Sequence, residues 1–325
     1  MLSFVLTSMT DWRLSIFGLI TLFVVYYLQD GIVGFVRNLF NLKRSGDAHK
    51  ISLSDTDAVG QAGGTSRRGE TLLTAKGVLM QFGGLKALNN VDLTIQRGTI
   101  HGLIGPNGSG KSTMMNVLTG IYVPTAGQIE FAGRTVVGRT SSDIALSGIA
   151  RTFQNVQLFG EMTALQNVQV GLHHAFESNL LDVALHTPRY LRENQANESR
   201  AMGLLRFVGL ADLAYEEARN LPYGKQRLLE IARALALDPQ LLLLDEPAAG
   251  LTAPDIKELI SFIRKIREHG ITVILIEHHM DVVMSMCDTV SVLDFGQKIA
   301  EGLPAAVQAD EKVIEAYLGA GHAAH

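Results

Sequence analysis

Hydrophobic and polar residues are distributed unevenly along this chain. Residues 14–28 contain no charged side chain, Trp12 precedes the run, and Tyr26 and Tyr27 lie near its end. The run is shorter than the roughly 20 residues of a typical spanning helix, but aromatic residues at both ends are typical of a bilayer interface. The pattern predicts that residues 1–44 form a short hydrophobic helix in the membrane, with a hydrophobic helix buried in protein as the alternative.

The charges beside this segment predict its orientation. Arg37, Lys43 and Arg44 follow the apolar run, whereas only Arg13 precedes it closely. Positive charge is enriched on the cytoplasmic side of membrane segments, so we expect the downstream chain in the cytoplasm, at the inner (plasma) membrane. A cleaved signal peptide is disfavoured, because no basic residue precedes Asp11 and no Ala-x-Ala site follows the run.

The pattern changes twice after the apolar segment. Residues 45–70 lack periodicity and are rich in Gly, Ser and charged residues, which predicts a flexible linker. From residue 71 to about residue 320 the chain is patterned throughout and has no internal repeat, which predicts one domain of about 250 residues. Residues 321–325 are a short tail.

Composition narrows the choice of partners and compartment. The 325 residues include 28 basic and 32 acidic side chains, and the net charge is −4. This balance gives no broad attraction to nucleic acid, so we expect no nucleic-acid partner. The single cysteine, Cys287, cannot form an intrachain disulfide and fits a reducing compartment as a small core residue.

A phosphate-binding loop is predicted in the stretch HGLIGPNGSGKST, which has an apolar strand, a Gly-rich turn and a helix start in that order. Gly105 and Gly110, with Lys111 and Ser112, match the spacing G-x-x-x-x-G-K-[ST]. Backbone N–H groups of such a loop converge on phosphate oxygens, the lysine contacts the terminal phosphates, and the serine hydroxyl ligates Mg²⁺. An unrelated Gly-rich turn is the alternative. The predicted nucleotide-binding residues here are Gly105, Pro106, Asn107, Gly108, Ser109, Gly110, Lys111, Ser112 and Thr113.

A second acidic motif, LLLLDEP, occupies residues 241–247. It predicts a buried strand that ends in two carboxylates, at the edge where parallel sheets bind ligands. We expect Asp245 to hold Mg²⁺ and Glu246 to orient or deprotonate the attacking water. Simple capping of the strand is the alternative interpretation.

Four further motifs accompany these two. LPYGKQRLLEIARALA, at residues 221–236, resembles the ABC-transporter signature; RTFQN surrounds Gln154, EPAAGLTAP follows the acidic pair, and VILIEHHMD surrounds His278. Their order and spacing resemble those of an ABC ATPase over about 250 residues. The resemblance implies an α/β fold, with a mostly parallel P-loop NTPase core, an antiparallel β subdomain and a helical subdomain near residues 160–220.

The resemblance narrows to one subfamily. The stretches FGGLKALNNVDLTIQRG, GIARTFQNVQLFGEMTALQNVQVG and VIEAYLGAG resemble the ATP-binding subunit of branched-chain (hydrophobic) amino acid ABC importers. The first 40 residues resemble the end of the cognate permease, which would make them a fused permease tail. Urea, short amides and aromatic acids stay open as solutes. Partners implied are a second ATP-binding subunit, identical or paralogous, the transmembrane permease, and through it a periplasmic or extracellular substrate-binding protein.

The resemblance also implies residue roles. Phe82 would stack on adenine, Gln154 would reach Mg²⁺ and the attacking water, and His278 would hold that water in line with Glu246. The expected cofactors are ATP and Mg²⁺, with catalytic residues Glu246, His278, Gln154 and Lys111 and metal ligands Ser112, Gln154 and Asp245. The signature would contact ATP held by the partner subunit, through Leu221, Tyr223, Gly224, Lys225 and Gln226.

Several positions depart from the family pattern. Pro222 and Lys225 alter the signature, Thr252 stands where an aspartate is usual, and so does His279. These changes put communication between two ATP sites in doubt but leave the predicted hydrolytic residues intact. The alternative function is a soluble or regulatory ABC ATPase not coupled to transport. Ribosome- or nucleic-acid-directed members carry two cassettes or a long coiled coil, and this chain has one cassette and no sustained heptads.

Overall fold

The computed structural model describes residues 69–176 and 178–318. The predicted membrane segment, nearly all of the predicted linker and the C-terminal tail lie outside these residues, so those assignments and their boundaries stay predictions. Within the described ranges, none of the helices has the length and apolar character needed to cross a membrane.

A six-stranded sheet forms the centre of the domain, in the order β10-β9-β3-β8-β7-β6. Neighbouring strands pair in parallel, except that β10 joins the edge antiparallel to β9. All residues of β3, β7 and β8 are buried, as expected for parallel strands covered on both faces. The strand bounds are β3 (Ile100–Ile104), β6 (Ile149–Arg151), β7 (Leu241–Asp245), β8 (Thr272–Ile276), β9 (Thr289–Asp294) and β10 (Gln297–Gly302).

A separate antiparallel sheet has the order β2-β1-β4-β5. Exposed and buried residues alternate along much of its long strands, so one face contributes to a core and the other meets solvent. Its strands are β1 (Thr71–Phe82), β2 (Leu85–Gln96), β4 (Ala126–Phe131) and β5 (Arg134–Thr135). The sheets confirm the predicted mostly parallel core with an antiparallel β subdomain.

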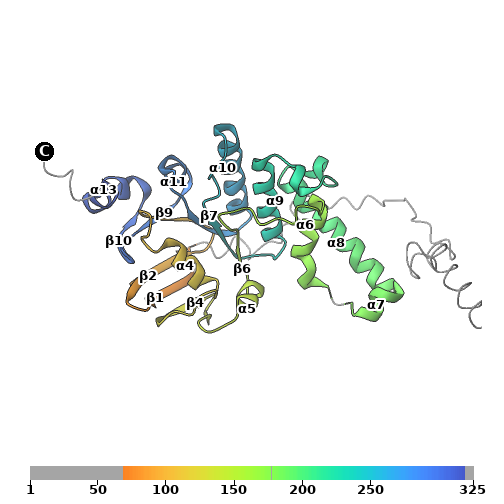
Figure 1. Ribbon diagram of the computed structural model, residues 1–325, viewed down its shortest axis with the longest axis horizontal. Coiled ribbons are helices and arrows are strands. Elements are labelled where there is room, and N and C mark those ends of the chain that lie inside the picture. The colour runs from red at the N-terminus through yellow and green to blue at the C-terminus, as the bar shows by residue number, and fades with distance from the viewer. Residues whose placement is uncertain (1–68, 177, 319–325) are drawn as a thin grey trace, which may run out of the picture. The chain divides into compact units, whose positions relative to one another are not determined.

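Strand β7 shows how the central sheet separates two cores. Leu241 and Leu243 lie in one cluster with α4 and the antiparallel sheet, whereas Leu242 and Leu244 lie in another with α9, α10 and α11. Alternate side chains of a strand point to opposite faces, so a run of four leucines supplies both clusters. Figure 1 shows α9 to α11 on one side of the sheet and α4 with β1 and β2 on the other.

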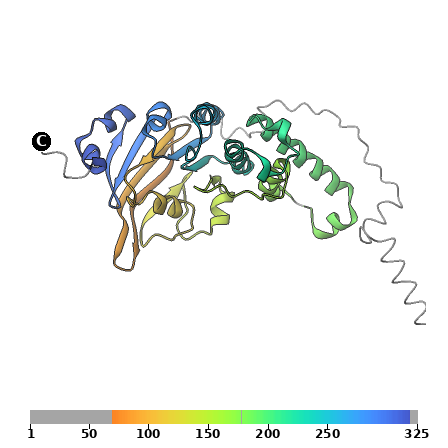
Figure 2. The same ribbon diagram turned by 45° about the horizontal axis from the view of Figure 1, so that its top comes forward.

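The helices include the predicted helical subdomain, which Figures 1 and 2 show at the end of the domain away from β10 and α13. Its longest member, α8, begins at Pro188, where the Thr187 side chain accepts from the Tyr190 N–H. Proline suits a first helical turn, whose N–H groups have no partner within the helix. The helix bounds are α4 (Lys111–Leu118), α5 (Ser141–Leu146), α6 (Ala164–Gly171), α7 (Leu180–Leu185), α8 (Pro188–Phe207), α9 (Tyr223–Leu235), α10 (Ala253–Glu268), α11 (Met280–Met286), α12 (Pro304–Gln308), α13 (Glu311–Leu318) and the 3₁₀ turns η2 (Leu172–Ala175), η3 (Ala211–Leu213) and η4 (Ala218–Asn220).

Candidate active site

The candidate site lies at the carboxyl edge of the central sheet. β8 pairs with both β3 and β7, all in parallel, so the segments that follow these three strands emerge side by side. They carry the phosphate-loop sequence, Glu246 and His278, respectively. Parallel topology thereby places the phosphate loop beside two residues that follow it by more than 100 positions in the sequence, at the edge where α/β sheets bind ligands.

The phosphate loop needs glycine for two physical reasons. Gly105, Gly108 and Gly110 all have positive φ, at 148°, 79° and 105°. A Cβ on Gly105 would lie 2.0 Å from the Leu293 carbonyl oxygen, and a Cβ on Gly110 would lie 2.6 Å from the Ala87 carbonyl oxygen. Neither backbone neighbour can move aside easily, so these two positions exclude every side chain.

Lys111 is the first residue of α4 and is buried beneath the loop. Its Nζ donates to the carbonyl oxygens of Gly105 and Pro106, at 2.8 and 2.9 Å. Burial lowers the pKa of Lys111, and the carboxylates of Glu246 and Asp245 act in the opposite direction. A buried ammonium ion at the start of a helix, beside glycine N–H groups, suits an anionic ligand.

Glu246 is held between two side chains from other segments. Gln154 donates from Nε2 to Glu246 Oε2 at 2.9 Å, and His278 Nε2 lies 2.6 Å from Glu246 Oε1. Glu246 itself has a positive φ of 47°, unusual for a residue with a side chain. Such strain persists where surrounding contacts enforce it, and here the Glu246 N–H also donates to the Ile276 carbonyl oxygen at 2.9 Å.

A hollow of about 370 Å³ joins the phosphate loop to Glu246 and His278. Phe82 lies at its rim, 43% exposed, with its ring edge-on to Tyr122 at 5.2 Å between centroids. The structure therefore brings the predicted adenine-stacking residue into the same hollow as the loop and the predicted catalytic pair. The lining residues are Phe82, Leu85, Lys86, Ala87, Asn107, Gly108, Gly110, Lys111, Ser112, Thr113, Glu246, His278, Phe295 and Gly296.

Comparison with known proteins identifies the family. The ABC transporter family profile matches residues 88–249, and a profile described as branched-chain amino acid ATP-binding cassette transporter matches residues 297–323. The high-affinity branched-chain amino acid transport ATP-binding protein LivG of Salmonella typhimurium is 43% identical over 251 residues, which are 77% of this chain and 98% of LivG. This chain belongs to the ABC transporter ATP-binding proteins. It is an ABC-type ATPase.

Other relatives agree with this assignment. BraF of Pseudomonas aeruginosa, a high-affinity branched-chain amino acid transport ATP-binding protein, is 43% identical over 76% of this chain and 98% of its own. Among solved structures, an ATP-binding cassette of an ABC transporter in its ADP conformation is 33% identical, with a TM-score of 0.68 over 77% of this chain and 99% of the cassette. The predicted ABC-type fold is thereby confirmed.

The signature residues of this ABC ATPase, at the start of α9, do not line the hollow. Pro222 directly precedes the first helical residue, and Gln226 Nε2 donates to the Leu221 carbonyl oxygen at 2.9 Å. Lys225 pairs with Glu258 of α10, its Nζ 2.8 Å from Oε1. The signature residues predicted to bind nucleotide are therefore separate from this chain's own phosphate loop, as the expected action on a partner's ATP requires.

Thr252, one of the departures from the family pattern, has a local structural role. It precedes α10; its hydroxyl accepts from the Asp255 N–H, and the Asp255 carboxylate accepts from the Thr252 N–H at 3.4 Å and also from the Thr252 hydroxyl at 2.6 Å. This reciprocal arrangement is a capping box, which satisfies N–H groups that a helix start leaves unpaired. Threonine at this position thus stabilises the start of α10.

The loop that carries Gln154 is fixed by a buried ion pair that the sequence reading missed. Arg227 is fully buried in α9, donates to the carbonyl oxygens of Phe153 and Gln154 at 2.8 Å each, and pairs with Glu230 at 3.0 Å. Glu230 accepts in turn from the N–H groups of Phe153 and Gln157. In the sequence, Arg227 and Glu230 are only an (i, i+3) charge pair on a predicted helix, and that pattern is equally compatible with two exposed charges.

Asp245 has a buried partner that was also missed. Arg151, at the end of β6, donates to Asp245 Oδ2 at 2.9 Å and to Asn116 Oδ1 of α4 at 2.6 Å. Both side chains of the Arg151–Asp245 pair are less than 10% exposed. The pair holds the Asp245 carboxylate at the sheet edge beside α4, whose second residue is Ser112.

The donor set at this edge fits Mg²⁺. The Ser112 hydroxyl, the Gln154 amide and the Asp245 carboxylate supply the hard oxygen atoms that this ion prefers. Clusters of three or more His, Cys, Asp or Glu that could hold a metal are absent from the described ranges.

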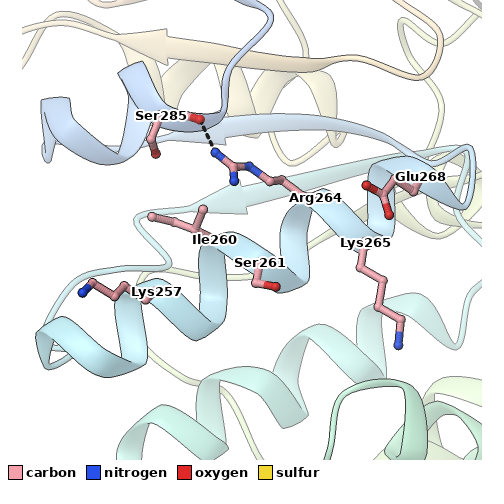
Figure 3. Close-up of a pocket in the computed structure, with 7 residues that line it drawn as sticks. All are labelled: Lys257, Ile260, Ser261, Arg264, Lys265, Glu268 and Ser285. Atoms are coloured by element: carbon pink, nitrogen blue, oxygen red, sulfur yellow. Dashed lines mark hydrogen bonds between the residues drawn. The ribbon is translucent and has the colours of Figure 1, made fainter.

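A larger hollow, of about 650 Å³, lies elsewhere, along α10. Figure 3 shows it bordered by Lys257, Arg264 and Lys265, with Arg264 donating to the Ser285 carbonyl oxygen on α11. Lys265 instead lies over the ring of Phe207, with Nζ 4.3 Å from the centroid. None of the predicted nucleotide-site residues lines this hollow, and its basic groups are individual surface side chains, so we assign it no ligand.

Proposed function

We propose that this ABC ATPase is the energising subunit of an importer for branched-chain or similarly hydrophobic amino acids. The observation that carries the hydrolytic part is Glu246, bracketed at 2.9 and 2.6 Å by Gln154 and His278 beside the phosphate loop. Support for the solute comes from LivG and BraF, and from the profile match over residues 297–323.

In this proposal ATP binds through the phosphate loop. Backbone N–H groups of residues 107–113 face the phosphate oxygens, and Lys111 exchanges its two carbonyl contacts for the terminal phosphates. Phe82 offers a flat apolar face to adenine. Ser112, Gln154 and Asp245 would hold Mg²⁺, which supplies positive charge to the phosphate oxygens when bound.

Hydrolysis then depends on Glu246. Its carboxylate would accept the proton of the attacking water, while His278 and Gln154 keep its two oxygens in place. Positioning and charge stabilisation are the main contributions to phosphoryl transfer, so a fixed carboxylate beside the γ-phosphate is an effective arrangement. The intact Glu246 and His278 disfavour a purely regulatory subunit.

Transport requires partners in this proposal. Two ATP-binding subunits, identical or paralogous, would close on two ATP molecules, each covered by the other subunit's signature helix. A hollow of about 450 Å³, between the Gln154 loop and the helical subdomain, would receive the permease, since Phe159 and Val170 at its border are more than 40% exposed. The solute itself would meet the permease and an external binding protein.

The membrane and cytoplasmic placement, and the permease-like origin of residues 1–44, are parts of the proposal that rest on the sequence.

Glu246→Gln tests the hydrolytic step. We expect the turnover number of the purified full chain to fall by about 100-fold or more, because an amide cannot take up the water proton at neutral pH. ATP affinity should change little, and the variant should accumulate as an ATP-bound dimer in size-exclusion chromatography with light scattering. Glu130→Gln, at an exposed carboxylate of β4, is the matched control. An unchanged turnover number would contradict the role of Glu246.

The solute is tested in the same variant. Cells whose only copy of this chain carries Glu246→Gln should lose high-affinity uptake of labelled leucine, isoleucine and valine, whereas glucose uptake should be unchanged. Unaltered uptake of all three amino acids, with ATP turnover abolished, would rule out these solutes and leave the ATPase assignment standing.

A further inference from the structure

An unassigned aromatic residue, Phe295, lines the same hollow as Phe82, the phosphate loop and Glu246. It occupies the turn between β9 and β10, and 86% of its surface is exposed. A large apolar ring held in water at the border of a ligand site, without packing against the protein core, is an arrangement that a bound ligand would improve.

The local backbone disfavours phenylalanine at this position. Asp294 pairs with Gln297, so Phe295 and Gly296 form a two-residue turn, and both have positive φ, at 41° and 76°. Turns of this kind prefer Asn-Gly, because asparagine tolerates positive φ far better than an aromatic residue does. The turn would be better formed without Phe295, so turn formation does not explain the ring.

The turn is also fixed to the nucleotide site. The Gly296 carbonyl oxygen accepts from the Asn89 N–H at 2.7 Å, and its N–H donates to the Ser109 carbonyl oxygen of the phosphate loop at 3.0 Å. A Cβ on Gly296 would lie 2.7 Å from the Ala87 carbonyl oxygen, so the turn backbone is in close contact with β2. These contacts hold the start of the Phe295 side chain at a defined place beside the loop.

We propose that Phe295 is a second aromatic contact for the bound nucleotide and covers its nucleoside part. The polar loop suits the phosphates, whereas the base and ribose offer apolar surface that Phe82 alone leaves partly exposed. Stacking or edge contact with an aromatic ring is sequence-tolerant and contributes measurably to binding of bases. The inference rests on the ATP site proposed above.

The decisive variant is Phe295→Asn in the full chain. Asparagine suits the turn, so the melting temperature without nucleotide should be unchanged or higher. Loss of the ring should weaken binding of ATP and ADP about fivefold in isothermal titration calorimetry, an intermediate value for one partly exposed aromatic contact. Affinity for inorganic tripolyphosphate, which has no nucleoside, should stay within about twofold.

Three companion variants sharpen the result. Phe295→Tyr keeps the ring and should retain ATP affinity. Tyr215→Asn removes an aromatic side chain that is 72% exposed and outside the hollow, and should have no effect on affinity. Phe82→Ala should weaken ATP binding if the proposed nucleotide site is correct.

The possible outcomes distinguish failure of the role proposed for Phe295 from failure of the proposed ATP site. Unchanged ATP affinity in Phe295→Asn, with affinity lost in Phe82→Ala, would overturn the role of Phe295 and leave the site intact. An equal loss of tripolyphosphate affinity, or a lowered melting temperature together with lowered affinity, would also overturn it, because either would mean that Phe295 acts by supporting the loop. Unchanged ATP affinity in both Phe82→Ala and Phe295→Asn would instead remove the proposed site and with it this inference.

Discussion

The phosphate loop and the Glu246 cluster are two halves of one site, built in different ways. The loop, residues 105–113, is a single continuous segment whose shape comes from backbone conformation and three glycines with positive φ. The Glu246 cluster joins three segments through side chains, with Gln154 after β6, Glu246 after β7 and His278 after β8.

Because the two halves are built differently, we expect substitutions in each half to change a different property first. A loop defined by its backbone should be disrupted by any added side chain, and the first loss should be in nucleotide binding. A cluster defined by side chains depends on the supports that fix each segment, so its variants should change the turnover number or the stability of the fold before they change affinity. Four predictions address these two halves and the elements that support them, from the largest expected effect to the smallest.

Arg227→Met should cause the largest loss of stability. It removes four hydrogen bonds from the Gln154 loop and α9 and leaves the Glu230 carboxylate buried without its cation. Removing one partner of such a pair costs about 3–5 kcal/mol in the free energy of unfolding. Urea titration followed by circular dichroism measures the change.

A matched control for this variant is Arg219→Met. Arg219 pairs with Glu217, but both side chains are at least 40% exposed, so the loss should be below about 1 kcal/mol. The double variant with Glu230→Gln should recover part of the Arg227→Met deficit, since glutamine keeps an acceptor without a charge. Equal effects of Arg219→Met and Arg227→Met would contradict the supporting role of the buried pair.

His101 should make the strand before the phosphate loop sensitive to acid. It is 2% exposed, its Nε2 lies 2.9 Å from Ser291 Oγ, and burial lowers its pKa from 6.5 to about 4. The unfolded chain therefore takes up a proton between these values that the folded chain refuses. Stability from this group is complete above pH 6.5 and falls by about 3 kcal/mol as the pH drops towards 4.

His101→Gln should flatten this part of the pH profile, which is measured by urea unfolding at several pH values. His173→Gln, at an exposed histidine of η2, should leave the profile unchanged. If the His101→Gln profile matched that of the wild-type chain, the acid loss would have to come from carboxylates instead.

Gly110→Ala should act mainly on the loop. The added Cβ would lie 2.6 Å from the Ala87 carbonyl oxygen at a φ of 105°. We expect a loss of about 2 kcal/mol in stability and roughly tenfold weaker ATP binding. Gly138→Ala has a similar positive φ but open space around the Cβ, so it isolates the conformational strain, and ATP affinity should be retained there. Similar ATP affinities in the two variants would show that the steric contact is unimportant.

His278→Ala should change catalysis more than binding. It removes the 2.6 Å contact with Glu246 Oε1, so the turnover number should fall about 10- to 100-fold, the value of one hydrogen bond to a charged group. His279→Ala removes the neighbouring imidazole, which has no hydrogen bond to Glu246 in the described part of the chain, and should reduce turnover far less. A larger effect on ATP affinity than on turnover would break the proposed division between the two halves.

Sequence reasoning was most successful where the relevant residues are contiguous. The phosphate loop was identified from nine adjacent residues, and β7 from four leucines before two carboxylates, since in each case the pattern itself carries the physical requirement. The roles of Gln154 and His278 needed a family resemblance, because a single glutamine or histidine has no local signature.

The buried charges and the strained turn escaped prediction for opposite reasons. Arg151, Arg227 and Glu230 looked like ordinary charges on a helix or strand end, and only packing shows that they are buried and paired. Phe295 and Gly296 form a two-residue turn in the structure, but they lack the Asn-Gly sequence that would have predicted such a turn. The membrane segment, residues 1–44, and the linker lie outside the described residues, except for the last residues of the linker, and stay predictions.

The sequence by itself indicated the phosphate loop and the strand before Glu246, and its resemblance to a family indicated the fold class and the family; the roles of the hydrolytic residues stay predictions. The phosphate loop and the buried strand rest on short patterns, namely glycine spacing and an apolar run, whose causes are local. Only the tertiary structure decided which charges are buried, which side chains hold Glu246, and which residue of a distant turn enters the nucleotide hollow. Those contacts depend on how strands and helices pack in the tertiary structure, which brings together residues that no local pattern relates.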